Sequence, residues 1–231
     1  MSSAGDPGAA LLELVAVMDR LRSPGGCPWD AEQTHESLLK YLIEETYELV
    51  EAVESGDRAH LREELGDLLL QVMFHSRIAA EHPADPFDID DVAAGIAAKL
   101  IHRHPHVFAT DAPGGDARTA QDVERNWEAL KAAEKGRTSS MDGVPLAQPA
   151  LALADKLLSR AAKSPLVVPV PQAALDADAD VGDVLFAVVA AARARGLDAE
   201  AELRGACRRF AATVRELEQA AASDSEEGGP A

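Results

Sequence analysis

The sequence contains few aromatic residues, two cysteines and no long apolar run, and each scarcity excludes a class of protein. Aromatic residues make up 4% of the 231 residues, which disfavours aromatic-rich β-sheet and favours Ala- and Leu-rich helices. Cys27 and Cys207 cannot form a disulfide framework, so a reducing compartment is expected. No apolar run approaches the roughly 18 residues of a membrane-spanning helix. The N-terminal residues lack the basic segment of a secretory signal.

Basic residues are also scarce. Lys and Arg number 22 against 40 Asp and Glu, which gives a formal net charge of −18. Nucleic acids and anionic membranes attract clustered cations, so neither is expected as a partner. A hydrophobic content of 47% is enough for a core and opposes a disordered chain. We therefore expect a soluble, cytoplasmic protein of the all-α class.

Apolar periodicity and turn signals divide the chain into helices and domains. Helices are expected over 9–22, from 31–34 to 54, and over 58–81, 88–102, 119–135, 151–162, 181–195 and 198–221. We predict a disordered N-terminus over 1–8, a catalytic domain over 9–140, a second helical region over 141–221 and a disordered acidic tail over 222–231. The catalytic domain is expected to be a bundle built on an antiparallel helix hairpin and completed by dimerisation.

The second helical region repeats part of the first domain. The segment GDLLLQV at 66–72 resembles GDVLFAV at 182–188, and each segment leads into an apolar helix with a basic end. The second copy lacks the carboxylate-rich helix that precedes the first. We interpret it as a degenerate duplicate with a structural or dimer-forming role, and chance similarity between two Ala/Leu helices is the alternative.

Two pairs of carboxylates flank a glycine turn. Glu45 and Glu48 are three residues apart, as are Glu64 and Asp67, so each pair lies on one face of its helix. The midpoint of the two pairs is Gly56, in the predicted turn. In an antiparallel hairpin both pairs then lie about 14 Å from the turn and converge if both faces point inward.

Four converging carboxylates repel one another unless cations neutralise them. All-oxygen ligands select Mg²⁺, Ca²⁺ or Mn²⁺. Mg²⁺ usually shares its ligand shell with substrate phosphates, so Mg²⁺ is the expected cofactor, with Mn²⁺ as a substitute. A single Glu pair is most often a solvated helix face. Two matched pairs within apolar sequence and symmetric about a turn instead favour a metal site that acts on a phosphorylated small molecule.

The carboxylate pattern and four further motifs resemble one family. Glu44-Glu45-x-x-Glu48 followed by Glu64-x-x-Asp67 is similar to the signature of MazG-type nucleoside triphosphate pyrophosphohydrolases. Four further segments are similar to motifs of that family and occur in the same order along the chain. They are GCPWD at 26–30, ELGDLLLQV at 64–72, KLIHRHPHVF at 99–108, and Trp127-Glu128-x-x-Lys131. The resemblance covers roughly 11–165.

The resemblance implies an all-α enzyme that cleaves nucleoside triphosphates between the α- and β-phosphates. Carried over by position, Glu45, Glu48, Glu64 and Asp67 would bind Mg²⁺, and Glu44 would activate water. Substrate-binding residues would be Lys99, Arg103, Trp127 and Lys131. It also implies a homodimer, and the substrates would be nucleoside triphosphates, among them non-canonical nucleotides.

Other interpretations of these residues remain open. Lys99 and Arg103 also fit the cationic end of a helix, Trp127 also fits a packing anchor, and Trp29 is more typical of a packing residue than of a base stack. A nucleotide sensor that binds without turnover is the alternative function. A purely structural adaptor is a third, and it would show no metal-dependent change in thermal stability.

Overall fold

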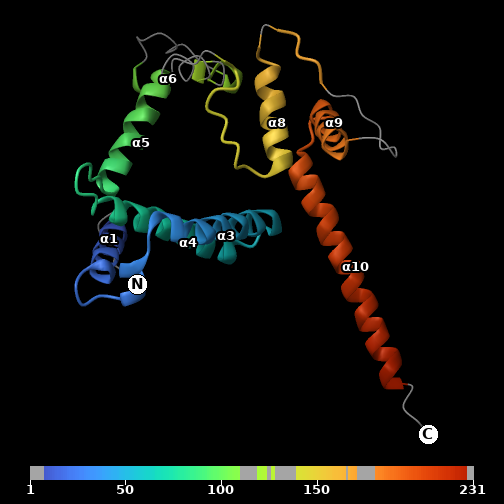
Figure 1. The fold of residues 1–231 in the computed structure, drawn as a ribbon, viewed down its shortest axis with the longest axis horizontal. Coiled ribbons are helices and arrows are strands. Elements are labelled where there is room, and N and C mark those ends of the chain that lie inside the picture. Colours follow the sequence, from blue (N-terminus) through green and yellow to red (C-terminus); the bar gives the residue numbers. More distant parts are fainter. Residues whose placement is uncertain are drawn as a thin grey trace. The chain divides into compact units, whose positions relative to one another are not determined.

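The computed structural model describes residues 8–109, 119–123, 126–127, 139–164, 166–170 and 180–227. All regular structure in these residues is helical, so the prediction of an all-α fold is confirmed (Figure 1). The contacts divide the chain into two units, Met1–Leu130 and Lys131–Ala231. No helix in the described ranges is long and apolar enough to cross a bilayer.

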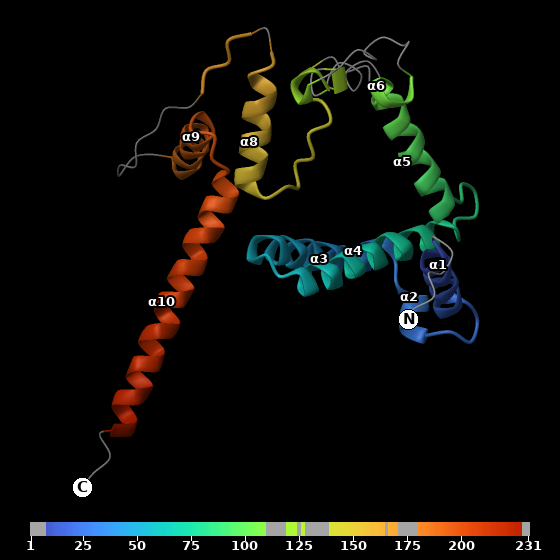
Figure 2. The same cartoon turned by 180° about the vertical axis from the view of Figure 1, so that it is seen from behind.

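The first unit is built around a long helical hairpin, shown from both sides in Figures 1 and 2. Its helices are α1 (Ala9–Arg22), α2 (Pro28–Glu32), α3 (His35–Ser55), α4 (Arg58–Ala79), α5 (Ile89–Arg103) and α6 (Pro105–Phe108). The bounds of the four longer helices, α1, α3, α4 and α5, follow the sequence predictions closely. The short helices α2 and α6 were not predicted, because each occupies only one turn and begins at a proline.

Local signals in the sequence fix both ends of the hairpin arms. Thr34 caps α3 and forms a reciprocal capping box with Ser37. Gly56 ends α3 with a left-handed φ of 75°, a conformation that costs glycine little. Asp57 then caps α4 by accepting hydrogen bonds from the backbone N–H groups of Ala59 and His60. The chain therefore reverses within two residues, and α3 and α4 run antiparallel.

One hydrophobic cluster holds α1 and α5 against the hairpin. Its buried members are Met18, Leu38, Met73 and Phe74, and Ile89 packs against them from the first turn of α5. Charged groups add a network at the end of α4. Arg22 pairs with Glu81 at 2.8 Å, and Arg77 bridges Glu81 at 2.8 Å and Asp19 at 2.9 Å. The cluster and the network together anchor the end of the hairpin that lies far from Gly56.

Trp29 packs as the sequence predicted. Its ring meets Tyr41 and Phe74 edge to face, with centroid separations of 6.0 and 6.4 Å. These contacts pack α2 against Tyr41 of α3 and Phe74 of α4.

The second unit contains α8 (Ala150–Ala161), α9 (Val181–Ala194) and α10 (Ala199–Glu227). Ala154, Leu158 and Val189 form its small core. The helix predicted over 198–221 continues to Glu227, into the segment predicted to be a disordered tail. Of the helix predicted over 119–135, the structure describes only 119–123 and 126–127.

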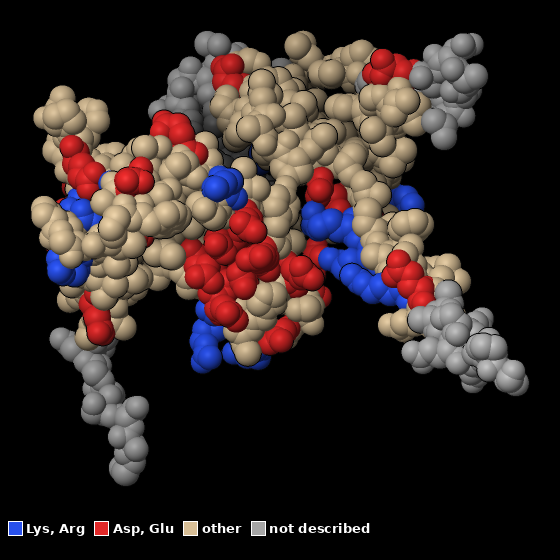
Figure 3. Space-filling view, turned by 60° about the horizontal axis from the view of Figure 1, so that its bottom comes forward, with Lys and Arg blue, Asp and Glu red and all other residues tan. Residues whose placement is uncertain are grey.

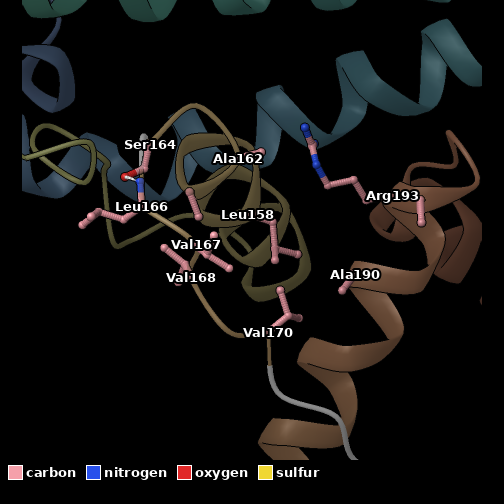
Figure 4. A pocket seen from close by; sticks show the side chains of 11 residues that line it. Leu158, Ala162, Ser164, Leu166, Val167, Val168, Val170, Ala190 and Arg193 are labelled. Atoms are coloured by element: carbon pink, nitrogen blue, oxygen red, sulfur yellow. Dashed lines mark hydrogen bonds between the residues drawn. The ribbon is translucent and has the colours of Figure 1, made fainter.

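A cavity of about 500 Å³ lies beside this second core. Figure 4 shows Leu158, Val167, Val170 and Ala190 around it, with Arg193 at its edge. Arg193 pairs with Asp155 at 2.9 Å. The lining is apolar apart from Arg193 and Ser164, so the cavity lacks the carboxylates on which the predicted chemistry depends.

Candidate metal centre

The hairpin brings three of the four predicted ligands together. Glu45 and Glu48 from α3 and Glu64 from α4 each present a carboxylate oxygen, and these atoms all lie within 4.8 Å of one another. Acidic side chains gather in one dense patch on the face seen in Figure 3. The helices α3 and α4 run antiparallel, and the acidic residues on each lie at a similar distance from Gly56. Glu45 and Glu48 therefore meet Glu64, although at least 16 positions separate them in the sequence.

The three carboxylates differ in burial. Glu64 is buried, with a side chain that is 7% exposed. Its Oε1 lies 3.0 Å from His60 Nε2. Its Oε2 is buried and has no hydrogen-bond partner in the described part of the chain. A buried carboxylate oxygen without a partner is costly, so this atom needs a ligand.

Asp67 contributes to the same electrostatic environment. The pKa of the Glu45 carboxyl is raised, first by burial and then by the negative charges of Asp67, Glu48 and Glu64. A hydrogen bond with Glu48 raises it further. Mutual repulsion of this kind is relieved by a proton or a cation. Glu44, on the same helix, is exposed and lies outside the group of three.

These residues fit a hard divalent cation. The donors are all carboxylate oxygens, which suit Mg²⁺ or Mn²⁺ rather than soft metals. Glu64 Oε2 is buried and has no hydrogen-bond partner in the described residues, and burial followed by the neighbouring negative charges raises the pKa of Glu45. Glu45, Glu48 and Glu64 are therefore positioned to hold such an ion, with Asp67 beside them.

The predicted cations of α5 form a second group. Lys99 is exposed, whereas Arg103 is only 5% exposed. The guanidinium of Arg103 lies over the ring of Trp127, 5.7 Å from its centroid. His104 meets the same ring edge to face at 4.9 Å and places its Nδ1 2.6 Å from the Leu100 carbonyl oxygen. Arg103 and Trp127 thus pack together, while Lys131 lies outside the described residues.

The sequence did not single out His60. It occupies the third position of α4, and its spacing of four residues from Glu64 was the available signal. Histidines one turn from a carboxylate are common on helix surfaces, so that spacing alone carries little information. In the structure, the 3.0 Å distance between His60 Nε2 and Oε1 of the buried Glu64 shows that His60 contacts the centre.

The second unit uses the corresponding carboxylate differently. Asp180, which aligns with Glu64 when 182–188 is matched to 66–72, caps α9 and accepts hydrogen bonds from the backbone of Gly182 and Asp183. The capping role explains why Asp180 stabilises a helix end rather than joining a carboxylate cluster.

The fold and the centre define a class: an all-α protein whose helical hairpin carries a carboxylate cluster suited to a divalent cation. Comparison with known proteins identifies the family. Residues 33–108 match the MazG nucleotide pyrophosphohydrolase domain. These residues contain the hairpin, all four predicted ligands and the α5 cations.

Relatives extend this similarity over most of the chain. The nucleoside triphosphate pyrophosphohydrolase/pyrophosphatase MazG of Thermotoga maritima is 38% identical, over 93% of this chain and 88% of the relative. A nucleoside triphosphate pyrophosphohydrolase of Mycolicibacterium smegmatis is 49% identical, and the match covers 94% of this chain but 62% of the relative. A solved mazG-related protein from Thermotoga maritima is 28% identical over 52% of this chain, with a TM-score of 0.43. The chain belongs to the MazG family.

Proposed function

We propose that this protein is a Mg²⁺-dependent hydrolase that converts nucleoside triphosphates to monophosphates and pyrophosphate. The observation that carries the proposal is the carboxylate cluster of Glu45, Glu48 and Glu64, with its buried and unpartnered Glu64 Oε2. The names of the relatives add support, because those that are named for an activity act on nucleoside triphosphates.

The proposal gives each carboxylate a role. Glu45, Glu48, Glu64 and Asp67 hold Mg²⁺, for which Mn²⁺ substitutes. When bound, Mg²⁺ supplies charge neutralisation at the phosphates and lowers the pKa of a bound water. Glu44, exposed on α3 next to Glu45, accepts a proton from the water that attacks the α-phosphorus, and pyrophosphate leaves in line.

Cations must meet the phosphates, because a triphosphate carries about four negative charges that the acidic cluster repels. We assign this role to Lys99, Arg103 and Lys131, and we place Trp127 against the nucleotide. The guanidinium of Arg103 suits bidentate contact with phosphate oxygens. Its contact with the Trp127 ring supports a shared role, since the ring orients the guanidinium.

The proposed enzyme is a homodimer. Apolar side chains on the outer face of the hairpin are about half exposed, among them Leu39, Ile43 and Leu65. A second copy covers them and completes the bundle, as the family resemblance implies. A cytoplasmic location agrees with the free thiols of Cys27 and Cys207. Neither nucleic acid nor a membrane is a partner in this proposal, and its biological role is the clearance of non-canonical nucleotides.

Product identification with each of the eight canonical triphosphates, with and without Mg²⁺, tests the proposal. We expect monophosphate and pyrophosphate only when the metal is present. Glu64→Gln and Asp67→Asn should each lower kcat at least ~100-fold, because each removes a charge that holds the metal. Glu13→Gln on α1 is a matched control and should keep full activity.

Each other result has a defined meaning. Diphosphate and orthophosphate as products would exclude attack at the α-phosphorus. Tight binding of Mg²⁺ and nucleotide without turnover would instead identify a nucleotide sensor. Full activity in both hairpin variants would contradict the metal assignment.

A further inference from the structure

Glu64 is the most deeply buried carboxylate of the centre, and its two oxygens are treated differently. Oε1 lies 3.0 Å from His60 Nε2, within reach of the ring N–H. Oε2 has no partner in the ranges that the structure describes and belongs to a side chain that is 7% exposed. Oε1 thus contacts a side chain of the protein, whereas Oε2 is available to a ligand.

The position of His60 is itself fixed. Its backbone N–H donates to Asp57 Oδ1 at 3.2 Å as part of the cap of α4. Its side chain is 37% exposed, so the ring reaches inward from the surface, one turn before Glu64. The cap of α4 thus holds the backbone of His60 one turn before Glu64.

An exposed pair of this spacing stabilises a helix by only a few tenths of a kcal/mol. The present pair differs because Glu64 is buried and its second oxygen has no other partner. A carboxylate free to rotate about its last bond would offer either oxygen to an ion. Rotation would break the 3.0 Å contact between Oε1 and His60 Nε2, so this contact favours one orientation of the carboxylate plane.

We propose that His60 is a positioning residue that orients Glu64 for metal binding. The neutral ring donates its Nε2–H to Oε1, and Oε2 then binds the divalent cation as a single ligand oxygen. His60 touches neither the ion nor the nucleotide. This inference rests on the proposed function, because it concerns the metal centre on which that function depends.

The test is direct titration of the full-length protein with Mn²⁺, followed by electron paramagnetic resonance, alongside thermal unfolding of the metal-free protein. His60→Phe removes the donor, and we expect Mn²⁺ affinity to fall about 10-fold, the lower end of the usual effect for an outer partner of a metal ligand. His60→Gln places an N–H at a similar reach and should restore affinity to within about threefold of the native protein. His82→Phe, at a histidine beyond the end of α4, is the matched control and should leave affinity unchanged.

Activity separates positioning from general stability. His60→Phe should raise the Mn²⁺ or Mg²⁺ concentration needed for half-maximal turnover about 10-fold, and saturating metal should recover kcat. A purely structural role would lower the melting temperature without changing metal affinity, and this result would overturn the proposal. Equal affinities in the native protein and His60→Phe would also overturn it while the proposed function stands. Failure of the native protein to bind Mn²⁺ would overturn both.

Discussion

His35 Nδ1 and His75 Nδ1 lie 2.7 Å apart and share one hydrogen bond between the two arms of the hairpin. The rings are almost parallel, with an interplanar angle of 3° and centroids 5.0 Å apart. One ring must donate its proton and the other must accept it, so at least one histidine stays neutral while the bond exists. The bond joins the first residue of α3 to the last third of α4.

This pair makes stability depend on pH. The pKa of His75 is lowered from 6.5, first by burial and then by the charge of His35. The folded state disfavours the protonated ring, so stability is full above pH 6.5 and is lost as pH falls below it. We expect His75→Phe to reduce the slope of unfolding free energy against pH between 7 and 5, by at most about 1.4 kcal/mol per pH unit. Urea unfolding across this range measures it. An unchanged slope would contradict the prediction, and His82→Phe is the control.

Glu45 makes stability depend on metal. Its pKa is raised from 4.5, so the metal-free fold loses stability as pH rises and the carboxyl ionises. At pH 7, Glu45→Gln should therefore raise the melting temperature of the metal-free protein by ~2–4 °C, the shift that 1 kcal/mol produces at this size. The same variant should lose the stabilisation that Mg²⁺ gives to the native protein. Thermal unfolding with and without Mg²⁺ measures both effects. A lower melting temperature without metal would show that Glu45 stabilises the fold by other contacts.

The contact between Trp127 and Arg103 predicts that the two side chains act together in nucleotide binding. Their contact has a length typical of a cation–π pair, which contributes about 0.5–2 kcal/mol. Trp127→Ala should raise the KM for nucleoside triphosphates about 3- to 30-fold with little change in kcat, whereas Trp127→Phe should keep most of the affinity. Steady-state kinetics at saturating Mg²⁺ distinguishes the cases. A fall in kcat at constant KM would place Trp127 in the chemical step instead.

The sequence predicted the hairpin and its cluster because both depend on local rules. The Gly56-Asp57 turn, the helix caps and the three-residue spacings of the acids determine which faces meet. These rules act within a few residues, so they can be recognised without a structure.

Other features depend on packing between distant segments. His35 and His75 are 40 residues apart and no pattern links them. Arg103 was predicted to contact phosphate, with a helix-end cation as the alternative, and neither prediction indicated its burial or its contact with the ring of Trp127 from a later segment. The unequal environments of the two Glu64 oxygens depend on how far α3 buries that side chain. Such contacts follow from tertiary burial, which spacing alone does not determine.

Two glycines of the hairpin should respond in opposite ways to the same substitution. Gly56 has a φ of 75°, and a Cβ placed there meets nothing within 4 Å. Gly56→Ala should therefore cost about 1 kcal/mol through backbone strain alone. Gly66 lies inside α4, also with open space around a Cβ. Gly66→Ala should stabilise the protein by about 0.5–1 kcal/mol, because alanine favours the helix.

Chemical denaturation of both variants, with sedimentation to follow assembly, measures these effects. If the proposed dimer forms, a stabilised Gly66→Ala protein that remains dimeric would show that this part of α4 has room for a methyl group in the proposed dimer. Destabilisation of Gly66→Ala together with loss of the dimer would contradict the prediction. It would also place Gly66 at a close contact with the second copy, since the single chain leaves that position open.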